Sequence, residues 1–308
     1  MTLNSQFPVS RRTLMAGAIS AAACSLAGRL GVAAEREDES PYRICAFIKF
    51  VQSLSFRELA ERIAELGFDG IEATVRPKGL IEPERASDEL PELVEELHRC
   101  GLAIDVMTTN VVEALDVVSR NLLKTASELR VLRYRMGYFR YDMKRPLMPQ
   151  LEPLQAQINE LADVNRELGL TAVYQNHAGS GYVGSTIWDL QQLLQSVPSS
   201  DIGIAFDIRH ATAEAGMSWP VLFRVAEPHL QAIYVKDFVW EGRRPRNVPL
   251  GEGQVNPEFF RQLRKSPFSG PISLHVEYLP KASVEENLTA LGDDLAELKS
   301  MLDRASDE

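Results

Sequence analysis

Two periodicities of apolar residues alternate along most of the chain. Short runs of β-branched and aliphatic residues predict buried strands, and the amphipathic segments between them predict helices. The pattern repeats eight times. The predicted strands are 44–50, 70–75, 103–108, 131–136, 171–175, 202–207, 232–236 and 272–277. Helices are predicted from the N-cap residue Ser55 to Gly67 and over 88–99, 120–129, 154–168, 187–196, 219–225, 257–265 and 284–304.

This alternation predicts a fold in which parallel strands are joined by helical crossovers. Eight strand and helix pairs favour closure into a single (β/α)₈ TIM barrel of the α/β class, and residues 35–308 have a suitable length for one such domain. An open doubly wound sheet is the alternative. That fold favours a glycine-rich loop after the first strand, where this chain has Val51, Gln52 and Ser53. No second domain is expected.

The first 34 residues have the features of an export signal. Arg11 and Arg12 are followed by a short Ala- and Gly-rich apolar run over 16–30 and by small residues up to Ala34. We therefore predict a twin-arginine signal peptide over 1–34 and a periplasmic location. An ordinary N-terminal helix is the alternative. The run is short for a transmembrane helix, and no membrane span is expected in the rest of the chain.

Net charge limits the kind of partner. The whole chain carries a formal charge of −10, and the predicted leader holds three arginines and no acidic residue, so residues 35–308 carry about −13. An acidic surface of this kind is unfavourable for binding nucleic acid, which requires clustered Lys and Arg. Cys45 and Cys100 lie in apolar contexts, so we expect small buried side chains rather than a disulfide.

Polar residues gather where the predicted strands end, at the barrel mouth where TIM barrels carry their chemistry. They are Lys49, Glu72, Tyr134, Arg135, Arg140, Gln175, His177, Asp207, Arg209, His210, Lys236, His275 and Glu277. Three of the five histidines belong to this set. Imidazole and carboxylate ligands suit a divalent ion, so we predict a site for Zn²⁺, Mn²⁺, Co²⁺, Fe²⁺ or Mg²⁺.

At these positions the sequence resembles the xylose-isomerase-like barrels, a family that includes ketose epimerases, hydroxypyruvate isomerase and endonuclease IV. The motifs are GFDGIE at 67–72, FDIRH at 206–210, VKD at 235–237, HVEY at 275–278 and the loop PLGEG at 249–253. Their order and spacing imply the family's barrel fold. Endonuclease activity is not expected, because the net charge has the wrong sign and several further ligands would be needed.

The resemblance implies a metal held by side chains that follow strands five to eight. Asp207 and Glu277 match two of these ligands. The other two positions, usually Glu and His, are occupied by Gln175 and Tyr234, which are poor ligands because an amide is neutral and a phenol ionises only near pH 10. A rebuilt set of ligands would comprise His177, Asp207, Glu277 and either His210 or His275.

The resemblance also implies proton transfer next to a carbonyl, performed in the family by two glutamates that flank the metal. Gln175 cannot accept a proton, so we expect Glu277 to act with His177 or His210. The expected substrate-binding residues are Lys49, Glu72, Tyr134, Arg135, Arg140, Gln175, Arg209, Lys236 and Trp240. The cations among them suit a sugar or sugar-derived acid, although some could instead pair with acidic residues inside the barrel.

Three functions remain open from the sequence. The first is a sugar isomerase or epimerase, the second a lyase or hydrolase that acts on a modified sugar at the same site, and the third a non-catalytic carbohydrate-binding barrel. The small-molecule partner is in each case a carbohydrate or sugar acid. The resemblance further implies a homo-oligomer, since many members of the family form dimers or tetramers.

Overall fold

Eight parallel strands close into a barrel in the computed structural model, which describes residues 41–306. Their order around the barrel is β1-β10-β7-β6-β5-β4-β3-β2. The strands are β1 (Ile44–Phe47), β2 (Gly70–Thr74), β3 (Ala103–Thr108), β4 (Arg133–Arg135), β5 (Thr171–Gln175), β6 (Ile202–Asp207), β7 (Leu230–Val235) and β10 (Ile272–Leu274). The predicted (β/α)₈ barrel is confirmed.

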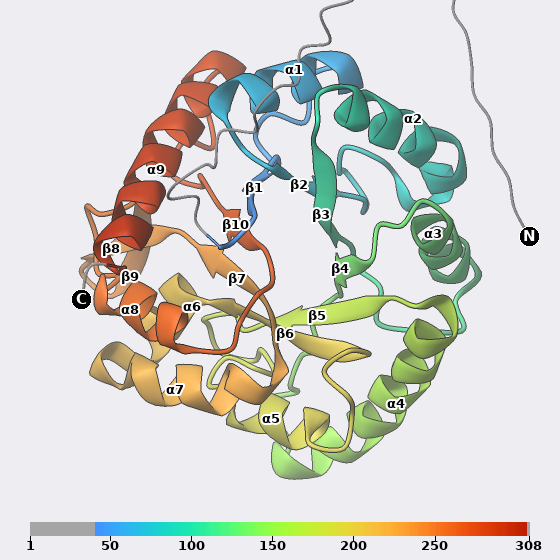
Figure 1. Ribbon diagram of the computed structural model, residues 1–308. Coiled ribbons are helices and arrows are strands. Elements are labelled where there is room, and N and C mark those ends of the chain that lie inside the picture. The colour runs from blue at the N-terminus through green and yellow to red at the C-terminus, as the bar shows by residue number, and fades with distance from the viewer. Residues whose placement is uncertain (1–40, 307–308) are drawn as a thin grey trace, which may run out of the picture. The chain divides into compact units, whose positions relative to one another are not determined.

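A ring of helices surrounds the barrel (Figure 1). They are α1 (Phe56–Leu66), α2 (Ala86–Arg99), α3 (Val117–Glu128), α4 (Leu151–Leu168), α5 (Trp188–Leu194), α6 (Ile208–Ala215), α7 (Trp219–Ala226), α8 (Glu258–Lys265) and α9 (Val284–Arg304). The limits predicted for the first helix are confirmed: Ser55 and Glu58 form a capping box, and Gly67 ends the helix with a φ of 83°. The main apolar core lies between the helices and the outer face of the barrel.

The inner face of the barrel is built in layers, because alternate side chains of a strand point to the same side. A small apolar cluster fills the interior, formed by Val106, Val173, Ala205, Ala232 and Tyr234. Two residues further along the same strands, toward their C-terminal ends, come Thr108, Gln175, Asp207 and Lys236. The period of two therefore places a polar layer directly above the apolar one.

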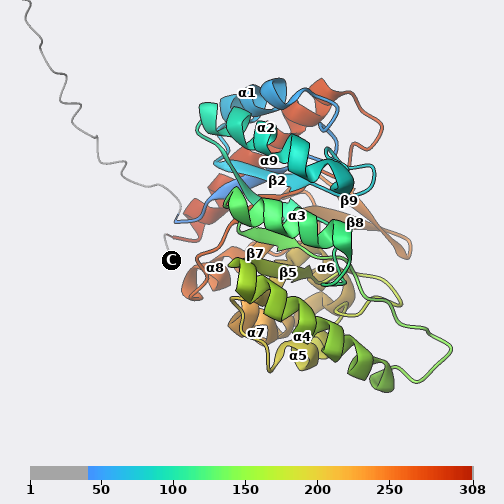
Figure 2. The ribbon, with the colours of Figure 1, turned by 90° about the vertical axis from the view of Figure 1, so that its right-hand side faces the viewer.

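Helix α6 and the strands β8 (Asp237–Glu241) and β9 (Arg244–Val248) were not predicted. Helix α6 begins immediately after β6, where the Asp207 side chain accepts a hydrogen bond of 2.9 Å from the backbone N–H of His210. Strands β8 and β9 pair as an antiparallel hairpin, which lies at the right-hand end of the barrel in Figure 2. The sequence of β9 has no apolar alternation, so periodicity could not reveal it.

Asp237 anchors the base of this hairpin. Its carboxylate accepts hydrogen bonds from the backbone N–H groups of Gly251 (3.2 Å), Gly253 (3.0 Å) and Val255 (2.9 Å). A Cβ at Gly253 would lie 2.2 Å from Asp237 Oδ1 and 2.4 Å from the carbonyl oxygen of Phe238. Only glycine therefore fits at this position, and the loop over 249–253 is fixed to the start of β8.

The predicted leader, residues 1–34, lies outside the described residues, so export by the twin-arginine route stays a prediction. Within residues 41–306, no helix combines the length and the apolar character needed to cross a bilayer.

The close approach at Gly253 leads to a stability prediction. Gly253→Ala forces a methyl group against backbone atoms, so we expect the free energy of unfolding to fall by about 1–3 kcal/mol, measured by urea denaturation. Glu252→Ala changes the exposed neighbouring residue and should alter stability by less than about 0.5 kcal/mol. Equal stability of Gly253→Ala and the native protein would contradict this account of the loop.

Candidate active site

Two cavities meet at the C-terminal ends of the barrel strands. The inner cavity has a volume of about 160 Å³ and is lined by Phe47, Lys49, Glu72, Arg76, Arg135, Tyr138, Gln175, His177, Lys236, His275 and Glu277. The outer cavity, of about 540 Å³, lies beside α6 and the β8–β9 hairpin. Three residues line both cavities: His177, Lys236 and Glu277. A base, a cation and a carboxylate thus stand where the two spaces join.

Lys236 joins two carboxylates at this junction. Its Nζ lies 3.1 Å from Asp207 Oδ2 and 2.8 Å from Glu277 Oε2, and its side chain is only 6% exposed. Burial alone would lower the pKa of Lys236, but Asp207 and Glu277 outweigh it and raise that pKa. Burial would raise the pKa of Glu277, whereas Lys236 and His275 lower it. All three groups are therefore charged at neutral pH.

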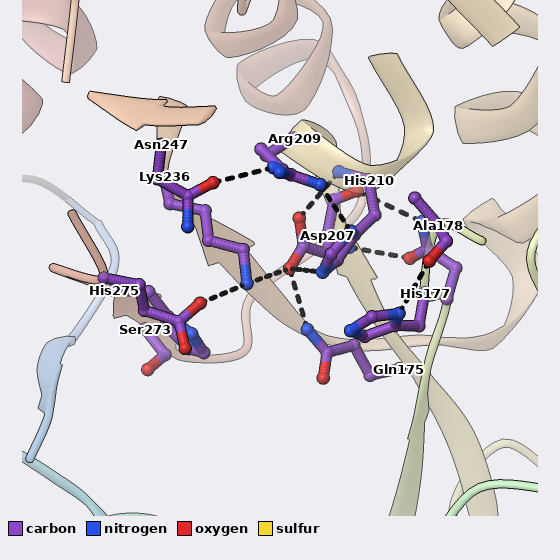
Figure 3. Close-up of polar contacts among 12 residues, drawn as sticks. Gln175, His177, Ala178, Asp207, Arg209, His210, Lys236, Asn247, Ser273 and His275 are labelled. Carbon is purple, nitrogen blue, oxygen red and sulfur yellow. Dashed lines mark hydrogen bonds and ion pairs between the residues drawn. The ribbon is translucent and has the colours of Figure 1, made fainter. Parts of the chain in front are cut away.

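Gln175 orients the buried carboxylate of Asp207 from the neighbouring strand. Its Nε2 donates a hydrogen bond of 2.7 Å to Asp207 Oδ2, and its Oε1 accepts one from the hydroxyl of Tyr138. Figure 3 shows Lys236 and Gln175 reaching the same carboxylate from different strands. Because the amide nitrogen faces Asp207, the oxygen of Gln175 faces Tyr138 instead.

His177 is arranged as a neutral base. Its Nδ1 lies 2.9 Å from the carbonyl oxygen of Ala178, and since that oxygen can only accept, Nδ1 carries the ring proton. Nε2 is then the ring nitrogen that can take up a proton. Burial, and next the charge of Lys236, lower the pKa of His177 below its usual value near 6.5, so the ring is neutral at neutral pH.

His210 has the opposite tautomer and supports its neighbour. Arg209 donates to its Nδ1 at 3.1 Å, so Nε2 carries the proton, and that atom lies 3.6 Å from Asp207 Oδ2. The rings of His210 and His177 pack with their centroids 4.0 Å apart. Burial and the charge of Lys236 lower the pKa of His210 well below its usual value. Its inward ring nitrogen carries the ring proton without a hydrogen-bond partner among the described residues, so it is not a free base.

Glu72 is the centre of a separate network on the other side of the inner cavity. It is fully buried and accepts hydrogen bonds from Thr108, from Ser273 at 2.5 Å and from His275 Nε2 at 2.9 Å. Burial alone would raise the pKa of Glu72, but the charge of His275 and these three hydrogen bonds lower it to about 2. Glu72 thus fixes the ring of His275 through this hydrogen bond. The same ring packs against Phe47 with centroids 4.3 Å apart.

Two of the predicted substrate-binding residues, Tyr134 and Arg140, line neither cavity, and Trp240 lines only the outer one. Tyr134 is corrected to a structural residue, because it faces the opposite side of β4 from Arg135 and its hydroxyl donates to Asn165 on α4 at 2.8 Å. Arg140 is exposed, stacks on Tyr182 at 3.2 Å from the ring centroid and lines neither cavity. Trp240, 47% exposed, lies on β8 and lines the outer cavity.

The other predicted substrate-binding residues line the cavities. The inner cavity contains Lys49, Glu72, Arg135, Gln175 and Lys236, and the outer cavity contains Arg209 and, again, Lys236. Arg209 donates to Asn247 of β9 at 3.1 Å and so connects α6 to the hairpin. Arg76 was not predicted; it is half-buried just after β2 and lines the inner cavity. Its position just after a strand could have identified it.

The five predicted metal ligands do not form one set. Asp207 and Glu277 face the same ammonium group, while His275 is turned toward Glu72. In the part of the chain that the structure describes, no three His, Cys, Asp or Glu side chains are grouped so that they could hold an ion. Tyr234 lies one layer below Lys236, and burial raises the pKa of its hydroxyl well above the usual value. As arranged, these donors fit an ammonium group and not a divalent ion.

Comparisons with known proteins agree with this architecture. A family model described as Xylose isomerase-like TIM barrel matches residues 60–301. A D-tagatose 3-epimerase-like protein shares 17% identity and a TM-score of 0.65, covering 86% of this chain and 98% of its own. A D-psicose 3-epimerase, solved in the presence of D-fructose, shares 16% identity and a TM-score of 0.62, covering 84% and 99%.

A third similar structure contains a metal. This Xylose isomerase-like TIM barrel protein from Mycobacterium smegmatis, solved in complex with magnesium, shares 17% identity and a TM-score of 0.58, covering 86% of this chain and all of its own. No curated protein matches the sequence. At these identities the similar structures show the fold.

Glu72 leads to a prediction about acid stability. Glu72→Gln removes a buried charged acceptor from three donors, so we expect the free energy of unfolding at neutral pH to fall by about 1–3 kcal/mol. The folded-state pKa of Glu72 is lowered to about 2 from 4.5, so its contribution is present above pH 4.5 and is lost as the pH falls toward 2.

The measurement is urea unfolding of both proteins between pH 7 and pH 3, where their difference in stability should shrink. The exposed Glu95→Gln on α2 is the matched control and should differ little from the native protein. A difference that does not change with pH would mean that Glu72 is not the charged centre of this network.

Proposed function

Because the chain belongs to the xylose isomerase-like TIM barrel family, we propose that it is an isomerase or epimerase that acts on a sugar or a sugar-derived acid by moving a proton next to a carbonyl. The observation that carries this proposal is the junction of the two cavities. A neutral histidine with a free ring nitrogen, a carboxylate and a buried ammonium group line it together. The sugar epimerases among the similar structures support the same kind of reaction.

His177 is the proposed proton carrier. Its Nε2 takes the proton from a carbon next to the substrate carbonyl, and the electron pair of that C–H bond moves toward the carbonyl oxygen to give an enolate. Delivery of a proton from water to the opposite face of the same carbon, with release of the proton on His177 to solvent, would give an epimer. Return of the proton to the neighbouring carbon, with proton transfer between the two oxygens, would give an isomer. No oxidant or reductant is needed in either case.

Lys236 is the proposed group that stabilises the enolate. An ammonium has three N–H donors, and two of them face Asp207 and Glu277, so one remains for a substrate oxygen. A buried, fixed positive charge of this kind stabilises negative charge as it develops. In metal-dependent members of such a family, a divalent ion supplies this polarisation; here a divalent ion would first have to displace Lys236.

Glu277 is proposed to orient Lys236 and to accept a hydrogen bond from a substrate hydroxyl. Burial would raise its pKa, but the charges of Lys236 and His275 hold it well below the usual range, so Glu277 is ionised but weakly basic. This favours His177 over Glu277 as the group that removes the proton.

The proton-transfer proposal can be tested in D₂O. A panel of ketoses and keto-sugar acids is incubated with the protein, and NMR is used to detect deuterium at the carbon next to the carbonyl. We expect His177→Gln to reduce the rate about 10²- to 10⁴-fold. His98→Gln, an exposed histidine on α2, is the matched control and should keep full activity.

The pH dependence follows from the neutral base. Because the pKa of His177 is lowered, kcat/KM should stay level around neutral pH and fall only when the pH drops below 6.5, where the ring becomes protonated. Turnover without deuterium incorporation, accompanied by an unsaturated product, would instead indicate a lyase. A rate unchanged in His177→Gln would refute the assignment of the base.

The role of Lys236 can be tested by metal binding. The native protein should not bind Mn²⁺ stoichiometrically, measured by EPR, because the ammonium fills the site between the carboxylates. Lys236→Met should lose about 3–5 kcal/mol of stability, since it leaves buried charges unpaired, and should gain affinity for Mn²⁺. Lys49→Met, which removes a more exposed lysine 3.5 Å from Glu277, should do neither. Stoichiometric Mn²⁺ binding by the native protein that is lost in Asp207→Asn would overturn this assignment.

A further inference from the structure

The inner cavity contains two guanidinium groups that lack a carboxylate partner. Arg135 is only 4% exposed, and its Nη1 has no hydrogen-bond partner within the described residues. Its Nε reaches Thr108 Oγ1 only at 3.5 Å, and its guanidinium lies 4.9 Å from the ring centroid of Tyr138. Arg76 is half-buried beside it and forms no ion pair with residues 41–306.

The two acidic residues that line the inner cavity already form ion pairs with other residues. Glu277 pairs with Lys236 at 2.8 Å and lies 3.5 Å from Lys49, and Glu72 pairs with His275 at 2.9 Å. No carboxylate that lines the cavity is left for the two arginines. The cavity therefore has an excess of positive charge, although the whole chain has a net charge of −10.

Two cations held together in a partly buried space destabilise each other. Both guanidinium groups line the same cavity, and burial, and next the charge of Arg135, lower the pKa of Arg76. A buried guanidinium with an unsatisfied N–H is unfavourable unless an anion completes its hydrogen bonds. The planar fork of arginine matches the two oxygens of a carboxylate, so a carboxylate ligand would satisfy both the charge and the geometry.

We propose that Arg76 and Arg135 bind a carboxylate group of the substrate, so that the protein acts on sugar acids rather than on neutral sugars. The inference deepens the proposed function and rests on it for the reaction. The inner cavity has the volume of about five water molecules at ~30 Å³ each. It therefore holds one end of a sugar acid, with the reacting carbon beside His177 and Lys236, and the rest of the molecule extends into the outer cavity.

The test compares sugars with and without a carboxylate group. Thermal stabilisation and calorimetric affinity are measured for D-glucuronate against D-glucose and for D-fructuronate against D-fructose, with D-fructose 6-phosphate and inorganic phosphate as separate probes. We expect the sugar acids to bind at least tenfold more tightly than the neutral sugars and more tightly than either phosphate. Added salt should weaken this preference.

Variants locate the anion on the two arginines. Arg76→Gln should weaken sugar-acid binding about 10- to 100-fold and leave the weak binding of neutral sugars unchanged. Arg135→Gln should do the same if circular dichroism shows that it is folded; Arg76, which is only half-buried, keeps the test decisive if it is not. Arg224→Gln, an exposed arginine on α7 that lines neither cavity, is the matched control and should bind like the native protein.

Several results would overturn the inference. They are equal binding of neutral sugars and sugar acids, no stabilisation by any sugar acid, tighter binding of the phosphates, or unchanged sugar-acid affinity in Arg76→Gln. These outcomes are separate from a failure of the proposed function. Binding of sugar acids through Arg76 without deuterium incorporation would leave the anion site standing and refute the proton transfer.

Discussion

The ammonium group of Lys236 holds the C-terminal end of the barrel together. Asp207 from β6, Lys236 after β7 and Glu277 after β10 meet at one point, and none of these charges could be buried alone without a large loss of solvation energy. Because Asp207 is fixed by Lys236, the groups that bind Asp207 are fixed as well: Gln175 turns its nitrogen inward, and helix α6 begins on the same carboxylate. Under the proposed function, the ammonium of Lys236 would supply the positive charge that a divalent ion supplies in metal-dependent relatives.

The fold could be predicted because the patterns that specify its strands and helices lie within short stretches of sequence. Each buried strand and amphipathic helix is visible in ten or so residues, and eight repeats have few ways to close, so β3, β5, β6 and α9 match the predicted ranges at both ends. The elements that were missed have weak local patterns. Helix α6 has eight residues and starts without a loop, and β9 consists of three polar residues, a proline and a single valine. An aspartate directly before 208–215 was the one signal of a helix start.

The candidate site could be predicted only in part. The rule that barrel chemistry follows the strand ends located Lys49, Gln175, His177, Lys236 and Glu277, which all line the inner cavity. That rule ignores the alternation of side chains along a strand. Tyr134 and Arg135 are neighbours, so only one of them can face the interior. It also could not show that His275 is bound to Glu72 or that Lys236 lies between the carboxylates, because such choices depend on distances between strands far apart in the sequence.

Lys236, which lines the inner cavity, and Asp237, which anchors the β8–β9 hairpin, are neighbours in the sequence. Lys236 points into the barrel, and Asp237 secures the loop over 249–253 to the base of β8. The far end of the hairpin, from Trp240 to Arg244, is not part of that attachment and borders the outer cavity through Trp240 and Arg243. Sequence changes at this tip can therefore reshape the outer cavity while His177, Lys236 and Glu277 stay in place. Under the proposed function, such changes would alter the length of substrate that fits and leave the proton-transfer groups unchanged.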